Sequence, residues 1–458
     1  MSNAHKQSEA LSPWGMPAAA AVEVFPLPGP FDATLALPGS KSFTNRALIL
    51  AAVANGTSIL RSPLFSDDSY WCIDALQKLG ISARSVREDD RIDIAGLGTG
   101  GSFHLNDAAA LPYIGSAGTI ARFLPGVIAA RGVGEITLTS SAQLARRPVS
   151  EMIAALRQLG AEIVLPEHGA FPIKITGGSL RGGTATISGQ LSSQFISGIL
   201  IAAPLAQTPV TLSVTGGIVQ ADYVRMTLSM MEDFGVQVKY SDDLSSFYIE
   251  PQEYRAREIT LEADASTATY FVAAAAATKS RITITNLNPE TLQPDFLFLE
   301  YLEKMGCSVT QETGHIILQG PQQLQGNKVF DFNACSDSTP ALAGIAPFSD
   351  GAIEVRGVAH IRKHESDRLS VMHGILQQAG VEVTEYEDGL NIVPVRGMPR
   401  HVVVDPHDDH RMAMAFSVMG LAGSGATITD PSCVSKTCPN FFELLQKIGV
   451  RCDVVGAV

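Results

Sequence analysis

The chain has 458 residues and a formal net charge of -13, with 45% hydrophobic and 17% charged residues. Such a composition is typical of a folded protein with room for two or three domains, and it argues against intrinsic disorder. The acidic balance, without any block of consecutive Lys and Arg, argues against nucleic-acid binding. The six cysteines form no CxxC pair, so we expect reduced thiols in a cytoplasmic protein.

The N-terminal segment is rich in Ala and Pro, and it lacks the basic start and sustained apolar core of a signal peptide. We therefore expect residues 1–23 to form a loose N-terminal extension. The longest apolar stretches of the chain are too short to span a bilayer, so we expect no membrane partner.

The first helix is predicted to begin in the stretch PGSKSFTNRAL, residues 38–48, with Ser42 as a candidate cap. Ser42 and Arg46 are four residues apart and share one helix face, and Lys41 lies at the positive end of the helix dipole. This arrangement favours binding of a carboxylate or a phosphate. It is not a nucleotide P-loop, because that motif requires a Gly directly before the Lys.

The chain then repeats one pattern six times: a helix-like segment, a Gly and a short strand-like run. The glycines are separated by 80, 75, 71, 74 and 69 residues, and a Gly suits the left-handed end of a helix. After five of them a polar turn leads to a second strand-like run, which predicts a hairpin. The six glycines are Gly80, Gly160, Gly235, Gly306, Gly380 and Gly449. The predicted helix starts repeat as well, near Ser42, Gly118, Ser193, Ser266, Ser338 and His410.

Positively charged residues lie beside several of these helix starts, and they lack the Glu-to-Lys spacing of a salt-bridged surface. We therefore interpret them as a cationic set for anionic ligands. The set consists of Arg147, Arg362, Arg368, Arg411 and Lys436. Asp337 precedes another predicted helix, where it could be a cap or a general base.

Two His-containing segments, HIRKHE and HDDH, offer donor atoms for a metal. The donors are His360, His364, Glu365, His407, Asp409 and His410. The interleaved arginines would repel a divalent ion, so we favour proton transfer over metal binding. The hydrolase motif GxSxG is absent, and no GxGxxG follows a strand as a dinucleotide site requires.

Eight ordered motifs resemble the 5-enolpyruvylshikimate-3-phosphate (EPSP) synthase family of enolpyruvyl transferases. They are LPGSKSFTNRAL, GSAGTIARFL, RRPV, SSQF, EADASTATYF, IRKHESDRL, DDHRMAMAF and SKTCPNFF. The resemblance implies an α/β fold of two similar domains, each made of three βαβαββ units (an inverse α/β barrel), with a cleft between them. Residues 1–38 with 263–458 would form one domain and residues 39–262 the other, and the crossings would act as a hinge.

The resemblance implies transfer of the enolpyruvyl group of phosphoenolpyruvate to the 5-hydroxyl of shikimate-3-phosphate, with release of phosphate. This is a shikimate-pathway reaction that leads to chorismate and the aromatic amino acids. It requires no metal or organic cofactor. We expect a monomer with two small-molecule substrates and no nucleic-acid or membrane partner. Gly118 leaves space where glyphosate binds in the family, which suggests sensitivity to that inhibitor.

Site residues are carried over by position. The resemblance assigns phosphoenolpyruvate binding to Lys41, Gly118, Arg147, Gln194, Arg368, Arg411 and Lys436. It assigns shikimate-3-phosphate binding to Lys41, Ser42, Arg46, Ser192, Ser193, Gln194, Gln220, Tyr223, Asp337, His360 and His364. The catalytic group would be Asp337, Glu365, His364, Lys41 and His410. Glu365 would protonate the methylene carbon and later remove a proton, and Asp337 would help to deprotonate the attacking hydroxyl.

The chain departs from the family pattern at four positions. His364 stands where most members have Lys, Ser116 where Asn is common, and Gln220 where a phosphate-binding Ser is usual, and His360 replaces a frequent Asn. The charge of His364 would depend on pH near neutrality, unlike that of Lys.

Three alternatives remain open. A UDP-N-acetylglucosamine enolpyruvyl transferase would carry a catalytic Cys in the loop SSAQLARRPVS, which contains none. A non-catalytic anion-binding relative could retain the fold, although the acidic and cationic residues are all present. An RNA-processing enzyme on a related repeat fold would need a basic surface.

Overall fold

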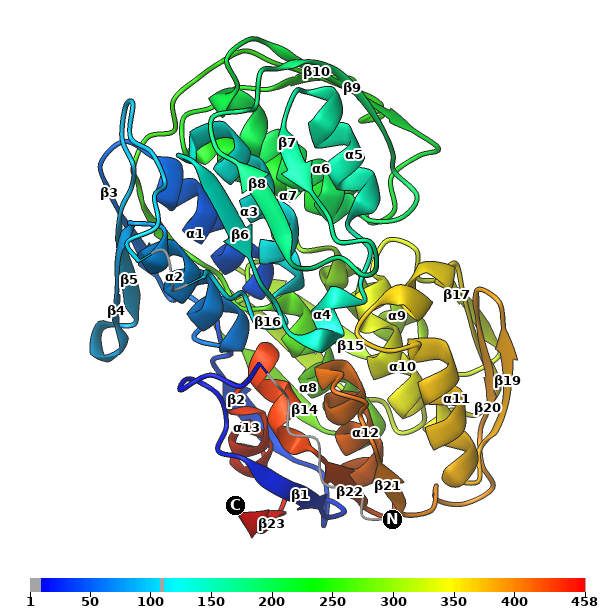
Figure 1. The fold of residues 1–458 in the computed structure, drawn as a ribbon. Coiled ribbons are helices and arrows are strands. Elements are labelled where there is room, and N and C mark those ends of the chain that lie inside the picture. Colours follow the sequence, from blue (N-terminus) through cyan, green and yellow to red (C-terminus); the bar gives the residue numbers. More distant parts are fainter. Residues whose placement is uncertain (1–9, 108–110, 458) are drawn as a thin grey trace. The chain divides into compact units, whose positions relative to one another are not determined.

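The computed structural model describes residues 10–107 and 111–457 of the chain (Figure 1). Contacts between residues divide the chain into two compact units. Unit 1 comprises Met1–Pro38 and Ala263–Val458, and unit 2 comprises Gly39–Glu262.

Unit 2 contains three small sheets, and in two of them a parallel strand pair is followed by an antiparallel hairpin. The strand orders are β13-β3-β5-β4, β9-β10-β12-β11 and β6-β8-β7. Its helices are α1 (Lys41–Val53), α2 (Asp67–Lys78), α3 (Gly118–Arg131), α4 (Ala142–Ala145), α5 (Ser150–Gln158), α6 (Ser193–Ala202) and α7 (Asp222–Asp233). Its strands are β3 (Thr57–Arg61), β4 (Ser82–Val86), β5 (Arg91–Ala95), β6 (Glu135–Leu138), β7 (Glu162–Val164), β8 (Ile173–Thr176), β9 (Gly183–Ser188), β10 (Val210–Thr215), β11 (Lys239–Tyr240), β12 (Ser246–Ile249) and β13 (Glu258–Thr260).

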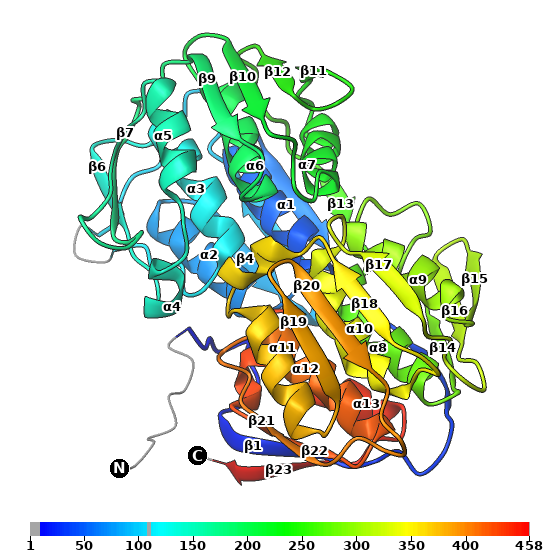
Figure 2. The ribbon, with the colours of Figure 1, turned by 90° about the vertical axis from the view of Figure 1, so that its right-hand side faces the viewer.

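Unit 1 repeats the same plan with the strand orders β2-β14-β16-β15, β17-β18-β20-β19 and β21-β22-β1-β23. Its helices are α8 (Ala265–Ala277), α9 (Phe298–Lys304), α10 (Thr339–Ile345), α11 (Arg368–Gln378), α12 (His410–Ala422) and α13 (Phe441–Lys447). Its strands are β1 (Ala19–Val24), β2 (Asp32–Leu35), β14 (Arg281–Ile284), β15 (Ser308–Glu312), β16 (His315–Gln319), β17 (Lys328–Asp331), β18 (Ile353–Arg356), β19 (Glu382–Tyr386), β20 (Gly389–Val393), β21 (Val402–Val404), β22 (Ala426–Thr429) and β23 (Cys452–Ala457). Figure 2 shows α11 lying against the sheet that contains β19.

The sixfold repeat predicted from the glycines is confirmed. All six glycines follow a helix and have φ between 80° and 97°, in the left-handed region. This conformation strains residues with a Cβ atom, which explains why a Gly recurs at each helix end.

The prediction of a loose extension over residues 1–23 is wrong for its last part. Ala19–Val24 is the strand β1, which pairs antiparallel with both β22 and β23. The N-terminal segment thus supplies the fourth strand of the sheet that contains β21, β22 and β23. Just before β1, the Met16 backbone N–H donates to Ser435 Oγ at 2.8 Å. Residues 1–9 of the predicted extension lie outside the described residues.

At each chain crossing, the last strand before the crossing pairs with a strand of its own unit, and the helix that follows belongs to the other unit. β2 leads into α1 but pairs with β14 in unit 1, and β13 leads into α8 but pairs with β3 in unit 2. β2 thereby joins the N-terminal segment of unit 1 to its C-terminal segment, and β13 pairs the end of unit 2 with β3 near its start.

The core of each unit is built on helices that are buried on every side. In unit 1, α8, α10 and α12 pack together, and α8 owes its close contacts to its run of alanines. Gly344 allows α10 to approach α12 so closely that a Cβ atom would lie 2.6 Å from the Ala415 carbonyl oxygen. Gly198 plays the same part between α6 and α3 in unit 2, where a Cβ atom would lie 2.1 Å from the Arg122 carbonyl oxygen. No helix in the described part of the chain is both long and apolar enough to cross a membrane.

Candidate active site

A buried arginine organises the polar cluster of unit 1. Arg368 is the first residue of α11, and its side chain is 1% exposed. Its Nε donates to Asp409 Oδ2 at 2.9 Å, Nη1 to Asp337 Oδ1 at 2.8 Å and Nη2 to Glu365 Oε2 at 2.8 Å. Burial alone would lower the pKa of Arg368, but the three carboxylates raise it above its usual value. Arg368 therefore stays charged and fixes three acids around one planar group.

The sequence analysis considered Asp409 only as a candidate metal ligand. In the structure it caps a helix and binds Arg368. It is fully buried at the start of α12, where it accepts the Arg411 backbone N–H at 3.0 Å. The same carboxylate receives Arg368 Nε and the Ser366 hydroxyl. Among the described residues, no group of three or more His, Cys, Asp and Glu is arranged to hold a metal. Asp409 thus serves as a helix cap that also orients the central guanidinium.

Asp337 lies between two arginines. It occupies the 3₁₀ helix η4 (Ser336–Ser338) that precedes α10, and it accepts from Arg368 Nη1 and Arg411 Nη2, both at 2.8 Å. Burial would raise the pKa of Asp337, but Arg411 and Arg368 outweigh burial and hold that pKa well below its usual value. Asp337 is therefore ionised.

Glu365 connects the arginine to a lysine. While Oε2 accepts from Arg368, Oε1 lies 3.1 Å from Lys436 Nζ, and the Glu365 and Lys436 side chains are 7% and 8% exposed. Lys436 ends the 3₁₀ helix η7 (Pro431–Lys436), which follows β22. Arg368, Arg411 and Lys436, which the sequence analysis grouped as one cationic set, thus share a network with three carboxylates.

Three histidines border this network. His364 Nδ1 lies 3.2 Å from Arg368 Nη1 and 3.8 Å from Asp337 Oδ1. Burial lowers the pKa of His360, whose Nε2 lies 2.8 Å from Ser336 Oγ. His410, the first residue of α12, is 1% exposed, with Nδ1 3.9 Å from Asp409 Oδ1.

Arg362 does not belong to the cluster, contrary to the grouping made from the sequence. Its Nη1 donates to Glu385 at 2.6 Å and to Asp367 at 3.1 Å, and its other nitrogens donate to backbone carbonyls of residues 386 and 387. Through these hydrogen bonds Arg362 connects the loop before α11 to β19. The partner Glu385 lies on a strand 23 residues away in sequence, which the local charge spacing could not indicate.

Unit 2 also contains a buried arginine, but its hydrogen-bond partners are neutral groups instead of carboxylates. Arg46 in α1 is 1% exposed, and it donates to Thr227 Oγ1 at 2.8 Å and to the carbonyl oxygens of Ser42 and Tyr223 at 3.0 Å. Its guanidinium also lies over the Phe123 ring of α3. Among the described residues, no carboxylate forms an ion pair with it, and burial lowers its pKa to about 10. A buried cation held only by neutral groups is suited to receive an anion.

The predicted helix starts in unit 2 are correct to within one or two residues. Lys41 and Ser42 are the first residues of α1, but Ser40 provides the cap by accepting the Phe43 N–H at 3.4 Å. Ser192 caps α6, and its Oγ accepts the Gln194 N–H at 3.3 Å. Ser193 and Gln194 are then the first residues of α6.

Gly118 begins α3 beside an arginine. A Cβ atom at this position would lie 2.6 Å from Arg147 Nη1 and 3.3 Å from Arg122 Nη1. Two residues before Gly118, Ser116 Oγ lies 2.7 Å from Ser141 Oγ. The absence of a side chain at Gly118 therefore permits the observed position of Arg147.

Gln220 and Tyr223 lie where β10 leads into α7. Gln220 has φ 51°, and its carbonyl oxygen accepts the Tyr223 N–H at 3.1 Å. The Tyr223 ring lies 5.7 Å from the Arg46 guanidinium carbon. Tyr223 thus contributes to the surroundings of Arg46 through both its carbonyl and its ring.

Sequence reasoning missed Thr227, which joins Arg46 to α6. Its hydroxyl accepts from Arg46 Nε and donates to Ser197 Oγ at 2.8 Å. Arg46 and Thr227 are 181 residues apart, and Thr227 lies in a helix of ordinary composition. Asp409 could have been recognised, because an Asp directly before a predicted helix is a typical cap.

Comparisons with known proteins show the family to which the chain belongs. The model of the family described as EPSP synthase (3-phosphoshikimate 1-carboxyvinyltransferase) matches residues 27–445. The chain is 46% identical over 431 residues to 3-phosphoshikimate 1-carboxyvinyltransferase 2 of Halalkalibacterium halodurans, covering 94% of this chain and 95% of the relative. It is 39% identical to 3-phosphoshikimate 1-carboxyvinyltransferase of Trichormus variabilis, covering 92% and 97%.

Solved structures give the same result for the fold. EPSP synthase from Acinetobacter baumannii has a TM-score of 0.79 at 26% identity, covering 94% of this chain and 99% of that one. The enolpyruvyl transferase NikO from Streptomyces tendae has a TM-score of 0.75 at 16% identity, covering 96% and 100%, and indicates the fold alone. These findings confirm the predicted fold class and the resemblance read from the motifs. The chain therefore belongs to the EPSP synthase (3-phosphoshikimate 1-carboxyvinyltransferase) family.

Proposed function

We propose that this chain transfers the enolpyruvyl group of phosphoenolpyruvate to the 5-hydroxyl of shikimate-3-phosphate and releases phosphate. The observation that carries the proposal is the shared guanidinium of Arg368, which holds both acids that the reaction requires. Asp337 and Glu365 each lie 2.8 Å from it. The family match over residues 27–445 supports this choice of substrates.

The proposed reaction has two steps. In the addition, Asp337 accepts the proton of the attacking hydroxyl, the oxygen bonds to carbon 2 of phosphoenolpyruvate, and Glu365 delivers a proton to the methylene carbon. In the elimination, Glu365 takes a proton back from that carbon, the bond from carbon 2 to the phosphate oxygen breaks, and the phosphate leaves with the proton that Asp337 had accepted. Cations near the phosphate and carboxylate stabilise the negative charge of the intermediate.

The contacts of Asp337 determine how it could act as a base. Two arginines at 2.8 Å lower its pKa and make it a weak proton acceptor. An anionic substrate that binds Arg411 or Arg368 would compete for those cations and raise the pKa of Asp337. We therefore propose that Asp337 becomes an effective base only when phosphoenolpyruvate is bound.

The residues of unit 2 are proposed to bind the substrate anions. Arg46, buried without an ion pair among the described residues, would bind a negative group of shikimate-3-phosphate. Lys41 at the start of α1 and Arg147 beside Gly118 would bind phosphoenolpyruvate. Ser42, Ser192, Ser193, Gln194, Gln220 and Tyr223 would complete the substrate contacts. The function requires these groups and the Arg368 cluster to act on the same pair of substrates.

We also propose a cytoplasmic location. The six cysteines are buried as free thiols, which suits a reducing compartment.

The decisive experiment mixes the purified protein with both substrates and measures phosphate release and formation of the enolpyruvyl ether. Both products should form in equal amounts, and Glu365→Gln should form neither while remaining folded. Phosphate release with UDP-N-acetylglucosamine in place of shikimate-3-phosphate would instead support the sister activity. Tight binding of both substrates without any product would support a non-catalytic anion-binding protein.

A further inference from the structure

Asp295 is a further buried acid, and the proposed reaction does not use it. Asp295 is 2% exposed, in the 3₁₀ helix η3 (Pro294–Leu297). Its Oδ2 accepts from Ser266 Oγ at 2.7 Å, and its Oδ1 accepts from Ser338 Oγ at 2.5 Å. The acid therefore binds two hydroxyls that belong to the starts of two core helices, α8 and α10.

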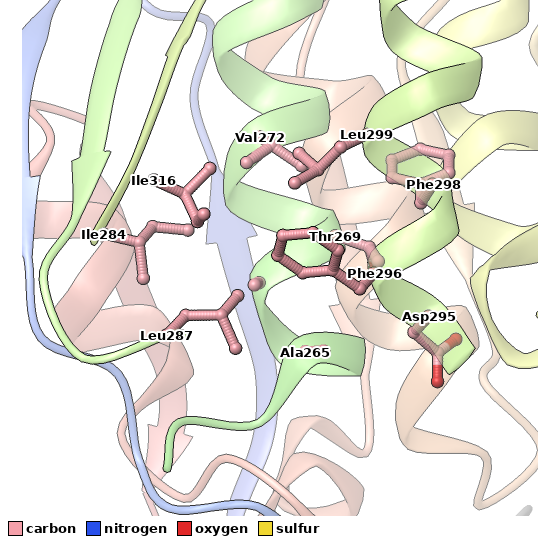
Figure 3. Close-up of a pocket in the computed structure, with 11 residues that line it drawn as sticks. Ala265, Thr269, Val272, Ile284, Leu287, Asp295, Phe296, Phe298, Leu299 and Ile316 are labelled. Atoms are coloured by element: carbon pink, nitrogen blue, oxygen red, sulfur yellow. The ribbon is translucent and has the colours of Figure 1, made fainter. Parts of the chain in front are cut away.

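Apolar side chains lie beside Asp295. Figure 3 shows an apolar pocket lined by Val272, Ile284, Leu287, Phe296, Leu299 and Ile316, with the Asp295 carboxylate turned away from these side chains. A carboxylate in apolar surroundings depends strongly on its hydrogen bonds, because water does not replace them. The two serine hydroxyls are thus held firmly by the acid.

The segment that carries Asp295 is itself attached to the chain crossing. Gln293 Oε1 accepts the Ala265 N–H at 3.0 Å, and its Nε2 donates to the Ala263 carbonyl oxygen at 2.8 Å. Asp295 consequently stands on a support that is fixed to the first turn of α8.

Ser338, the second partner, is the residue directly after Asp337, and it is completely buried. Its hydroxyl is bound to Asp295 while the neighbouring Asp337 carboxylate faces Arg368 and Arg411. We propose that Asp295 is a positioning residue that fixes the Asp337 carboxylate toward the two arginines by holding the Ser338 hydroxyl. This inference rests on the proposed function, in which Asp337 accepts the proton of the attacking hydroxyl.

The test compares two serines bound to the same acid. Ser338→Ala removes the bond next to Asp337, and the matched control Ser266→Ala removes the other bond of the Asp295 carboxylate. Loss of the buried hydrogen bond next to Asp337 should lower kcat/KM for shikimate-3-phosphate about tenfold to hundredfold in Ser338→Ala. Ser266→Ala should stay within about threefold of wild type, and Ser338→Thr, which keeps a hydroxyl, should restore most of the rate.

A double-mutant cycle separates positioning from a general structural role. If Asp295 acts through Asp337, Ser338→Ala in an Asp337→Asn background should change the residual rate by less than about twofold. Equal losses in both backgrounds, or a normal rate in Ser338→Ala, would overturn the inference. If Ser338→Ala does not fold, Asp295→Asn takes its place in the same cycle. An inactive wild-type protein would instead refute the proposed function itself.

Discussion

Asp409 and Arg368 form a buried ion pair at 2.9 Å, and the side chains are 0% and 1% exposed. Because Asp409 also caps α12, the pair fixes the orientation of the guanidinium relative to that helix. The remaining nitrogens of Arg368 then bind Asp337 and Glu365. The position of both proposed catalytic acids thus depends on a residue that touches neither of them.

The first prediction concerns this pair. Asp409→Asn should destabilise the protein by about 3 kcal/mol, because it leaves a buried guanidinium with one carboxylate fewer. It should also lower kcat at least about tenfold, because Arg368 loses its orientation. Urea unfolding and steady-state kinetics measure the two effects. A variant with wild-type stability and rate would show that Asp409 does not hold Arg368 in place.

Arg46 should behave in the opposite way to Arg368. Arg46→Met removes a buried cation that no carboxylate pairs among the described residues, so the free energy of unfolding should rise or remain within about 1 kcal/mol. Calorimetric titration should show loss of shikimate-3-phosphate binding by at least about tenfold, the equivalent of one charge-assisted bond. The matched variant Arg368→Met should destabilise the protein by more than Arg46→Met does. Similar destabilisation in both variants would show that the ion pairs of Arg368 do not make it more important for stability than Arg46.

Gly118→Ala should affect phosphoenolpyruvate more than folding. The added Cβ would lie 2.6 Å from Arg147 Nη1, the end of a flexible side chain that can move away. We expect the KM for phosphoenolpyruvate to rise by about tenfold, as for one weakened charged contact, with an unchanged melting temperature. Gly198→Ala is the control, because its Cβ would lie 2.1 Å from a backbone oxygen of α3 and should destabilise the protein. An unaltered KM in Gly118→Ala would show that Arg147 does not bind this substrate.

The stability contribution of Asp337 should depend on pH with a definite sign. Its folded-state pKa lies below the usual value, so its contribution is present above the unfolded-state pKa of about 4 and is lost as pH falls further. The difference in unfolding free energy between wild type and Asp337→Asn should therefore be constant from about pH 5 to pH 7 and shrink below about pH 4. Urea titrations at a series of pH values measure it. A difference that grows toward acidic pH would mean that the pKa of Asp337 is raised instead.

Truncation at the N-terminus should be tolerated only up to β1. Deleting residues 1–9 leaves β1 and the Met16 bond to Ser435 intact, so the melting temperature should stay close to that of the full chain. Deleting residues 1–24 removes the strand that pairs with β22 and β23, and the melting temperature should fall by several degrees. Equal stability of the two truncated chains would show that β1 is dispensable.

Local patterns in the sequence predicted the repeated elements correctly. Each of the six glycines ends a helix because the left-handed conformation is required at that residue alone. The predicted helix starts are correct to within one or two residues, because a helix cap is determined by residues that are close in sequence. The closing role of β1 was not predicted, since its partners lie about 400 residues away, as in the pairing of Ala21 with Thr429.

The sequence correctly grouped Arg368, Arg411 and Lys436 but wrongly added Arg362, and it did not indicate how the cations are paired. Arg368 is bound by carboxylates 31 and 41 residues away, Asp337 and Asp409, and no spacing rule connects such positions. The sequence therefore indicated binding of anions, whereas the structure also contains three acids that already occupy the cations of unit 1. Arg46 could not be distinguished from Arg368 without the folded arrangement.

One measurement tests the proposed function most directly. The purified protein is mixed with shikimate-3-phosphate and phosphoenolpyruvate, and phosphorus and proton NMR spectra follow both substrates over time. The proposal predicts that one enolpyruvyl ether at the 5-position and one phosphate appear for each phosphoenolpyruvate consumed. Phosphate without the ether, or two substrates that bind and remain unchanged, would contradict it.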